Sequence, residues 1–198
     1  MGKKDYWRQI LWSDETKINV FGSDGRIYVR RERGNRYLKK YLTPTVKHDK
    51  VNIKLWGCFS YNGVGRLEII KGNMDVIMYT KILKKNLKKS AKDLGLDENF
   101  VFHQDNDPKH TAKITDDWFE KNDINVLDWP SQSPDLNLIK NHWQYLKLRV
   151  HERLAKSVKD LEEKVIEEWY KIPVQVCQIY IESMERRIEA VFRSKGGN

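Results

Sequence analysis

The sequence predicts a mixed α/β fold built as one domain. Strand-like segments dominate its first part, and short apolar strands alternate with helical stretches after residue 75. Early strands followed by mixed elements favour an antiparallel meander joined to α/β units. A chain of 198 residues, 39% of them hydrophobic, is long enough for one well-packed core.

The meander is expected to occupy the first sixty residues. Residues 10–21 have the composition of a strand, and the glycines of 22–25 predict a turn. Residues 26–31 would form the second strand of this hairpin, and 51–61 a third strand. Between them, 30–50 form a polar, basic connection without periodicity.

A helix is predicted next, because apolar residues recur at helical spacing at Tyr79, Ile82, Leu83, Leu87 and Leu94. Gly95 suits the C-terminal cap of this helix. Five lysines fall on its other faces, and two interpretations stay open: a solvated face or a DNA-facing surface. These lysines are Lys81, Lys84, Lys85, Lys88 and Lys89.

The second half alternates short strands with helices. Strands are expected at 99–104 and 125–129, with a helix near 112–121 between them. One long helix follows, marked by the apolar stripe Leu136, Ile139, Trp143, Leu146 and Val150. Two helices, near 158–171 and 176–194, close the chain. Ser157 and Asp160 have the spacing of a capping box, and Pro173 separates the two helices.

Composition excludes several classes of protein. No apolar run approaches membrane-spanning length, and no signal-peptide pattern opens the chain. Cys58 and Cys177 are isolated in sequence, so neither a thiolate zinc site nor a disulfide framework is indicated. Two buried thiols in a reducing compartment are the expectation.

The chain is basic, with 37 Lys and Arg against 28 Asp and Glu and a net charge of +9. Such an excess favours a polyanionic partner, since Lys and Arg contacts to phosphates release counterions. Net charge alone is modest evidence for such a partner, since many basic proteins bind no nucleic acid specifically.

Three motifs follow one another in a fixed order. Asp14 lies in ILWSDETK (10–17), Asp105 in FVFHQDNDPKHT (100–111), and Lys140 in WPSQSPDLNLIKNHW (129–143). Asp14 and Asp105 are 91 positions apart, and Asp105 and Lys140 are 35 apart. In motif and interval the chain resembles the catalytic core of the Tc/mariner DDE transposases, closest to the Sleeping Beauty branch. The similarity runs from about Trp7 to about Trp169.

The resemblance implies a fold and a function. It implies an RNase H-like fold: a central mixed five-stranded sheet flanked by helices, with extra helices at the C-terminal end. Residues 1–198 would form a single catalytic domain without the N-terminal helix-turn-helix domains of the family. The implied activity is metal-dependent cleavage of DNA strands and strand transfer, in cut-and-paste transposition. The implied partners are double-stranded DNA, as transposon ends and target, and a second copy in a homodimer; the implied location is the nucleus.

The resemblance also assigns site residues. Asp14 and Asp105 would be metal ligands and catalytic residues, holding Mg²⁺ or Mn²⁺, with two ions in the family. Hard divalent cations need oxygen ligands, which grouped carboxylates supply. Asp107 more simply shapes the turn before Pro108. Two interpretations stay open for His110. It either contacts DNA or supports Asp105, or it is a structural histidine of the loop. Glu15 would point away from Asp14 in a regular strand, so it is not expected to be a ligand.

Lys140 occupies the position of the family's third acid, a glutamate, and Leu138 stands where the family has proline. With Asn137 as the N-cap, residue 140 would be the third residue of the helix, where glutamate suits a capping box. A lysine there places a cation at the positive end of the helix dipole, which costs about 0.3–1 kcal/mol at an exposed site. Lys140 either acts as a tethered counterion beside Asp14 and Asp105 or extends into solvent. Neither leaves three acids for a metal pair.

Three hypotheses follow. The chain is a transposase-derived catalytic domain that is inactive or impaired, a domesticated non-catalytic DNA-binding or interaction module, or a still-active two-metal nuclease. Tyr37 and Tyr41, interleaved with basic residues, fall where the family has an extension for dimer and DNA contacts. A flexible surface loop is the alternative for that segment.

Overall fold

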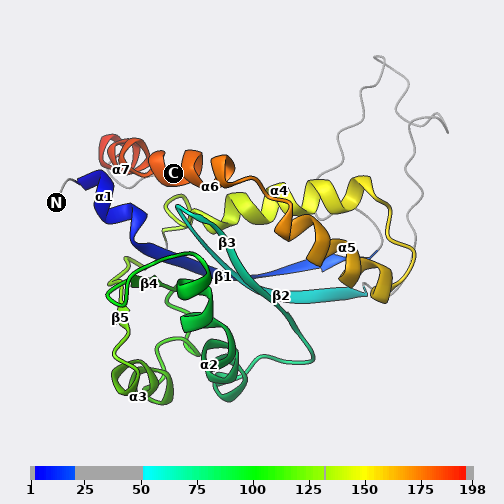
Figure 1. Ribbon diagram of the computed structural model, residues 1–198, viewed down its shortest axis with the longest axis horizontal. Coiled ribbons are helices and arrows are strands. Elements are labelled where there is room, and N and C mark those ends of the chain that lie inside the picture. The colour runs from blue at the N-terminus through cyan, green and yellow to red at the C-terminus, as the bar shows by residue number, and fades with distance from the viewer. Residues whose placement is uncertain (1–2, 21–50, 132, 195–198) are drawn as a thin grey trace.

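The computed structural model describes residues 3–20, 51–131 and 133–194 (Figure 1). The predicted turn at 22–25, the predicted strand at 26–31 and the basic connection with Tyr37 and Tyr41 lie outside the described residues.

The described residues form one mixed sheet of five strands in the order β3-β2-β1-β4-β5. The strands are β1 (Ile10–Asn19), β2 (Asn52–Ser60), β3 (Gly63–Ile70), β4 (Val101–His103) and β5 (Asn125–Val126). β1, β2 and β3 are antiparallel neighbours, whereas β4 is parallel to β1 and β5 is parallel to β4. This arrangement confirms the predicted mixed sheet.

Strand β3 was not among the strands predicted from periodicity. It carries two glycines, Gly63 and Gly65, which weaken a strand pattern. Gly63 has φ +134° at the turn from β2, a conformation that favours glycine. At Gly65 a Cβ atom would lie 2.6 Å from the Cys58 Sγ, so the close approach of β2 and β3 requires glycine.

Seven helices surround the sheet in the described residues. They are α1 (Lys3–Arg8), α2 (Val76–Asp93), α3 (Lys113–Lys121), α4 (Ile139–Glu152), α5 (Val158–Tyr170), α6 (Val174–Glu182) and α7 (Met184–Arg193). Within these residues, no helix combines the length and apolar character needed to cross a bilayer. The stripe predicted for α4 is buried, and so is that of α2 except Leu94, which is half-buried at the C-cap; Gly95 follows with φ +64°.

The expectation of one closing helix over 176–194 is wrong, because α6 and α7 are separated at Ser183. The Ser183 hydroxyl donates to the Tyr180 carbonyl at 2.6 Å and accepts from Arg187 Nε at 2.8 Å. A serine that bonds its own helix backbone competes with the regular ladder. Ser157 does cap α5: its hydroxyl accepts from the Asp160 N–H at 3.2 Å.

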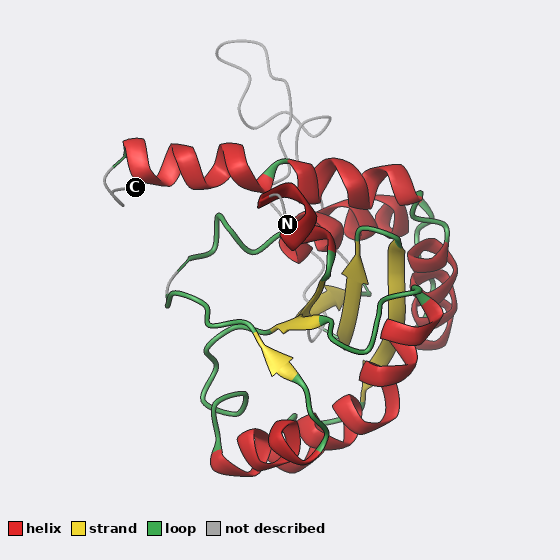
Figure 2. Ribbon diagram, turned by 60° about the vertical axis from the view of Figure 1, so that its left-hand side comes forward, coloured by secondary structure: helices red, strands yellow, loops and turns green. Residues whose placement is uncertain are grey.

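Two apolar clusters lie on opposite faces of the sheet, with helices on both sides (Figure 2). Alternate residues of β1 divide between them: Ile10, Trp12 and Ile18 join the cluster of α4, α5 and α6, and Leu11 joins that of α2. By this alternation, Asp14 belongs to the α4 face and Glu15 to the α2 face. Cys58 and Cys177 are free and buried, one in each cluster, as expected.

Candidate active site

Asp14 lies in β1, as predicted, whereas Asp105 lies in the loop after β4, the strand parallel to β1, and not in a strand. The register pairs Ile10 with Val101 and Trp12 with His103, and β4 ends there. Asp105 follows two residues after the end of β4, and its charge raises the pKa of Asp14. The Ser13 hydroxyl donates to the His103 carbonyl at 2.9 Å and ties the two chains together just before the acids.

Lys140 lies in the first turn of α4, on the face of the sheet to which Asp14 belongs. The next turn of α4 places Trp143 over Gly57, the residue of β2 that pairs with Asp14. The charge of Lys140 lowers the pKa of Asp14, but by less than burial and the charges of Glu15 and Asp105 raise it. Lys140 is exposed. Asp14 and Lys140 therefore lie on one face of the sheet, and a shared site with Asp105 stays a prediction.

The local structure at the start of α4 differs from the expectation. Leu138 is the N-cap and already has helical angles, φ −63° and ψ −32°. Asn137 is buried and makes no capping bond; its side-chain oxygen has no partner. Tight turns lead into the helix, since the Asn137 N–H donates to the Pro134 carbonyl and the Lys140 N–H to the Asn137 carbonyl. The first turn of α4 holds no acid, so no carboxylate in that turn balances the charge of Lys140 at the positive end of the helix dipole.

The charge state of Asp14 is set by its surroundings. Burial raises the pKa of Asp14 from an ordinary 3.8 to about 7, a backbone hydrogen bond at Glu15 lowers it, and the charges of Glu15 and Asp105 raise it further. Desolvation and like charges both favour the neutral carboxyl. A carboxyl held in this way is a candidate ligand, because a divalent cation would supply the missing positive charge.

Asp14→Asn is expected to raise the free energy of unfolding at neutral pH. Because the folded pKa is raised, the stabilising contribution of the protonated group is present below about pH 4 and is lost as pH rises to about 7, on the order of 2–4 kcal/mol. The asparagine stays neutral, so the variant should exceed the parent in free energy of unfolding at about pH 8 by that amount, and differ little at about pH 4. Urea unfolding in EDTA measures both, with the exposed Asp128→Asn as the control. Equal pH dependence in the parent and Asp14→Asn would contradict the expectation.

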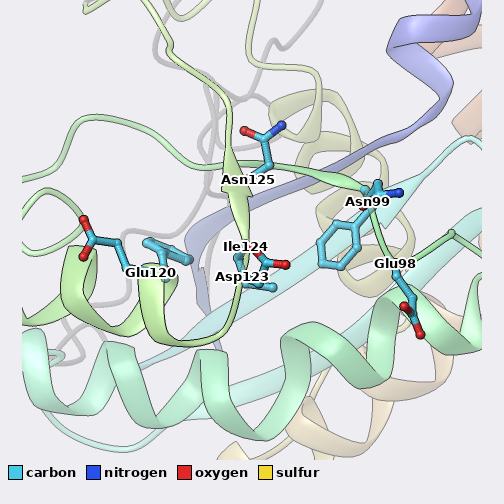
Figure 3. Close-up of a pocket in the computed structure, with 8 residues that line it drawn as sticks. Glu98, Asn99, Glu120, Asp123, Ile124 and Asn125 are labelled. Carbon is cyan, nitrogen blue, oxygen red and sulfur yellow. The ribbon is translucent and has the colours of Figure 1, made fainter.

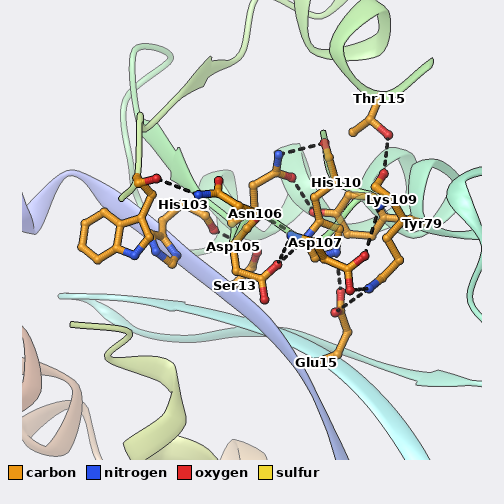
Figure 4. A network of polar contacts seen from close by, with 12 residues as sticks. Ser13, Glu15, Tyr79, His103, Asp105, Asn106, Asp107, Lys109, His110 and Thr115 are labelled. Atoms are coloured by element: carbon orange, nitrogen blue, oxygen red, sulfur yellow. Dashed lines mark hydrogen bonds and ion pairs between the residues drawn. The ribbon is translucent and has the colours of Figure 1, made fainter. Parts of the chain in front are cut away.

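Asp105 is held by His110 (Figure 4). His110 Nδ1 donates to Asp105 Oδ1 at 2.6 Å, and the Asp107 N–H donates to the same oxygen at 3.1 Å. The hydrogen bond from His110 is the main cause that lowers the pKa of Asp105 to about 2. The Asp105 side chain is 44% exposed, whereas His110 is 2% exposed. One oxygen is therefore engaged, and the carboxylate still reaches solvent.

Glu15 holds the other side of the His110 ring. His110 Nε2 donates to Glu15 Oε1 at 3.2 Å. Burial lowers the pKa of His110, but the hydrogen bonds and charges of Asp105 and Glu15 outweigh it and raise that pKa to about 9. Glu15 points to the α2 face, opposite Asp14, as alternation predicted. Its link to Asp105 was missed, since it depends on how the chain bends back after β4.

Helix α2 completes this network. The Tyr79 ring lies 4.1 Å from the His110 ring, and its hydroxyl donates to Gln104 Oε1 at 2.7 Å. Gln104 in turn donates to the His110 carbonyl at 3.1 Å. Asp107 shapes the turn, as expected: its side chain accepts from the Lys109 N–H at 3.1 Å. The only sequence signal for Tyr79 was its place on the buried stripe of α2.

The hollow in Figure 3 lies at the other end of these strands. Phe100 and Asn125, which help to line it, stand at the starts of β4 and β5, whereas Asp105 follows the end of β4. Sites in parallel sheets lie at the carboxyl ends of the strands. We therefore do not assign this hollow to the site of Asp14 and Asp105.

Comparison with known proteins agrees with this geometry. The family model of the DDE superfamily endonucleases matches residues 9–162. The Tcb1 transposase of Caenorhabditis briggsae is 42% identical over 190 residues, covering 96% of this chain and 69% of the relative. The Tc1 transposase of Caenorhabditis elegans is 41% identical with the same coverage.

Solved structures show the same fold. A Mos1 transposase paired-end complex with left transposon end superposes with a TM-score of 0.79 at 20% identity, covering 98% of this chain and 57% of that one. A Mos1 catalytic domain with Raltegravir and Mg gives a TM-score of 0.69 at 20% identity, covering 99% of this chain and 88% of that one. The chain thus spans little more than half of the longer Mos1 protein. It belongs to the DDE superfamily endonucleases, as the RNase H-like catalytic domain of a Tc/mariner-type transposase.

Proposed function

We propose that this chain is a transposase catalytic domain that keeps its fold and its affinity for DNA but has lost a working metal site. Lys140 carries the proposal, because a lysine stands where the family has its third acid, at the start of α4 on the face of the sheet to which Asp14 belongs. The activity of the intact site is metal-dependent cleavage at transposon ends and strand transfer into target DNA. Here that activity is absent or strongly impaired.

The donor set decides whether metal fits. Asp14 and Asp105 are the residues that would hold an ion, and a pair of Mg²⁺ or Mn²⁺ ions would activate an attacking oxygen and stabilise a leaving one. Within the part of the chain that the structure describes, no group of three or more His, Cys, Asp or Glu side chains is placed to hold a metal. Two carboxylates and a lysine do not fit two divalent ions. The matched Mos1 structures named with Mg and Mn support metal use by the fold.

A nicking assay on supercoiled plasmid with Mn²⁺ tests the proposal. The parent chain should leave the plasmid supercoiled, and Lys140→Glu should nick it. Activity in the parent equal to that of the variant would make the chain a still-active two-metal nuclease and overturn the proposal. Metal binding is measured in parallel. It separates a site that binds no metal from a chain that does not bind the plasmid.

A second candidate is a non-catalytic DNA-binding or interaction module in a host role. The polar network around His110 favours it. His110 still bonds both Asp105 and Glu15, although a lysine stands at the position of the third acid. Both candidates share DNA as the partner. A nuclear location and a homodimer belong to the same proposal, with support from the Mos1 paired-end complexes among the matched structures.

The chain should bind duplex DNA weakly and with little sequence preference. Contacts of Lys and Arg to phosphates are expected to dominate, so the dissociation constant should be on the order of 10⁻⁴–10⁻⁶ M at physiological salt. Fluorescence anisotropy over a series of salt concentrations should show affinity falling steeply as salt rises. A slope near zero in a plot of log affinity against log salt would contradict DNA binding through phosphates.

A further inference from the structure

Helix α2 presents a one-sided array of lysines. Its buried side chains, among them Tyr79, Leu83 and Leu87, face the sheet. At 3.6 residues per turn, the six exposed lysines fall within an arc of about 140° on the opposite side, over a length of about 16 Å. We call these residues the α2 lysine arc: Lys81, Lys84, Lys85, Lys88, Lys89 and Lys92.

The arc is nearly without counter-charges. In the described residues, one of the six lysines has an acidic partner: Lys85, whose Nζ lies 2.7 Å from Glu68. Asp93, the single acid of α2, pairs with Arg66 instead. Lysines three and four residues apart repel one another and destabilise a helix by about 0.2–0.5 kcal/mol per pair. The arc therefore does not serve the stability of α2.

The basic excess is not spread evenly over the chain. Helix α5 mixes five acids with two lysines, and its Lys164 lies 2.7 Å from Asp160. Residues 21–50 hold nine basic and three acidic residues. Outside α2 and 21–50, acids slightly outnumber bases. The basic excess of the chain is thus confined to two segments.

We infer that the α2 lysine arc binds the phosphate backbone of duplex DNA, at a surface distinct from the site of Asp14, Asp105 and Lys140. Duplex DNA carries one negative charge per about 1.7 Å of axis, so an arc about 16 Å long faces several phosphates. Lysine acts as a point charge without the fork that reads bases, so the contact is sequence-independent.

The N-terminal end of α2 contacts the loop that carries Asp105. Tyr79, at the start of α2, packs against His110 in the loop that carries Asp105. The lysines lie on the side of α2 that faces away from the sheet, so the arc is a surface separate from the site. This inference rests on the proposed function only in taking DNA as the partner.

The test compares two triple variants with the same loss of charge. Lys81→Gln, Lys84→Gln and Lys88→Gln remove half of the arc. Lys121→Gln, Lys156→Gln and Lys159→Gln remove three exposed lysines elsewhere. Binding to a short duplex of mixed sequence is measured over a salt series, together with thermal melts.

The arc triple should bind more weakly, with the log–log salt slope reduced by about 2–3, since each lost phosphate contact removes about 0.9. The control triple should change the slope by less than about 1. The melting temperature of the arc triple should be unchanged or higher at low salt, because repulsion within α2 is relieved.

Equal slopes in the two triples would overturn the inference while leaving DNA binding intact. A lowered melting temperature of the arc triple would also overturn it, by giving the lysines a structural role. A parent chain without salt-dependent binding would remove the inference together with the proposed DNA partner.

Discussion

Replacing Lys140 by glutamate is expected to lower the melting temperature in the absence of divalent metal and to raise it in the presence of metal, each relative to the parent. In EDTA, Lys140→Glu should melt below the parent, because a third carboxylate would repel Asp14 and Asp105. With Mn²⁺ it should melt above the parent, since the variant gains a ligand and loses a competing cation. At about 100 times the dissociation constant, bound metal adds about 2.7 kcal/mol to the free energy of unfolding.

Lys140→Gln is the matched control for this prediction. It removes the cation without supplying a carboxylate, so it separates the loss of competition from the gain of a ligand. Thermal melts in EDTA and in a Mn²⁺ series are compared for the parent and both variants. If Lys140→Gln gained as much from Mn²⁺ as Lys140→Glu, the missing acid would not be what disables the site.

Gly57→Ala is expected to destabilise the domain by about 3 kcal/mol through overpacking. A Cβ atom at Gly57 would lie 2.6 Å from the Trp143 Cη2 and 3.2 Å from the Trp169 Cη2. These rings are stacked with centroids 5.0 Å apart and are buried. Trp169 cannot easily retreat, because its Nε1 donates to the Gly65 carbonyl at 2.8 Å.

Denaturant unfolding measures this loss, with Gly72→Ala as the control. Gly72 has φ +82° and nothing within 4 Å of an added Cβ, so alanine there brings backbone strain without a clash. That strain costs about 1 kcal/mol or slightly more. A loss at Gly57 no larger than the loss at Gly72 would show that Trp143 and Trp169 yield without cost, and would contradict the expected overpacking.

The longer helices α2, α4 and α5 could be predicted because each rests on local periodicity. The stripe of Tyr79, Ile82, Leu83 and Leu87 is buried on α2 as the 3.6-residue period requires. Asp14 lies within the strand β1 and Asp105 follows β4, and these two strands pair side by side as the motifs implied.

Features that depend on contacts between distant segments could not be predicted. Strand β3 is held by the close approach of Gly65 to Cys58, which periodicity does not reveal. The break at Ser183 is a local feature, since its hydroxyl bonds the Tyr180 carbonyl three residues before it, and the apolar periodicity carries no signal of it. The link from Glu15 to Asp105 joins segments that are adjacent only after the chain turns back at His110.

The most direct test of the central claim is a calorimetric titration of the parent chain and Lys140→Glu with Mn²⁺. The account predicts that the parent does not bind a pair of ions, because two carboxylates beside a lysine supply too few ligands and a competing charge. Lys140→Glu should bind Mn²⁺ measurably. A parent chain that binds two ions as tightly as Lys140→Glu would contradict the claim that Lys140 disables this site.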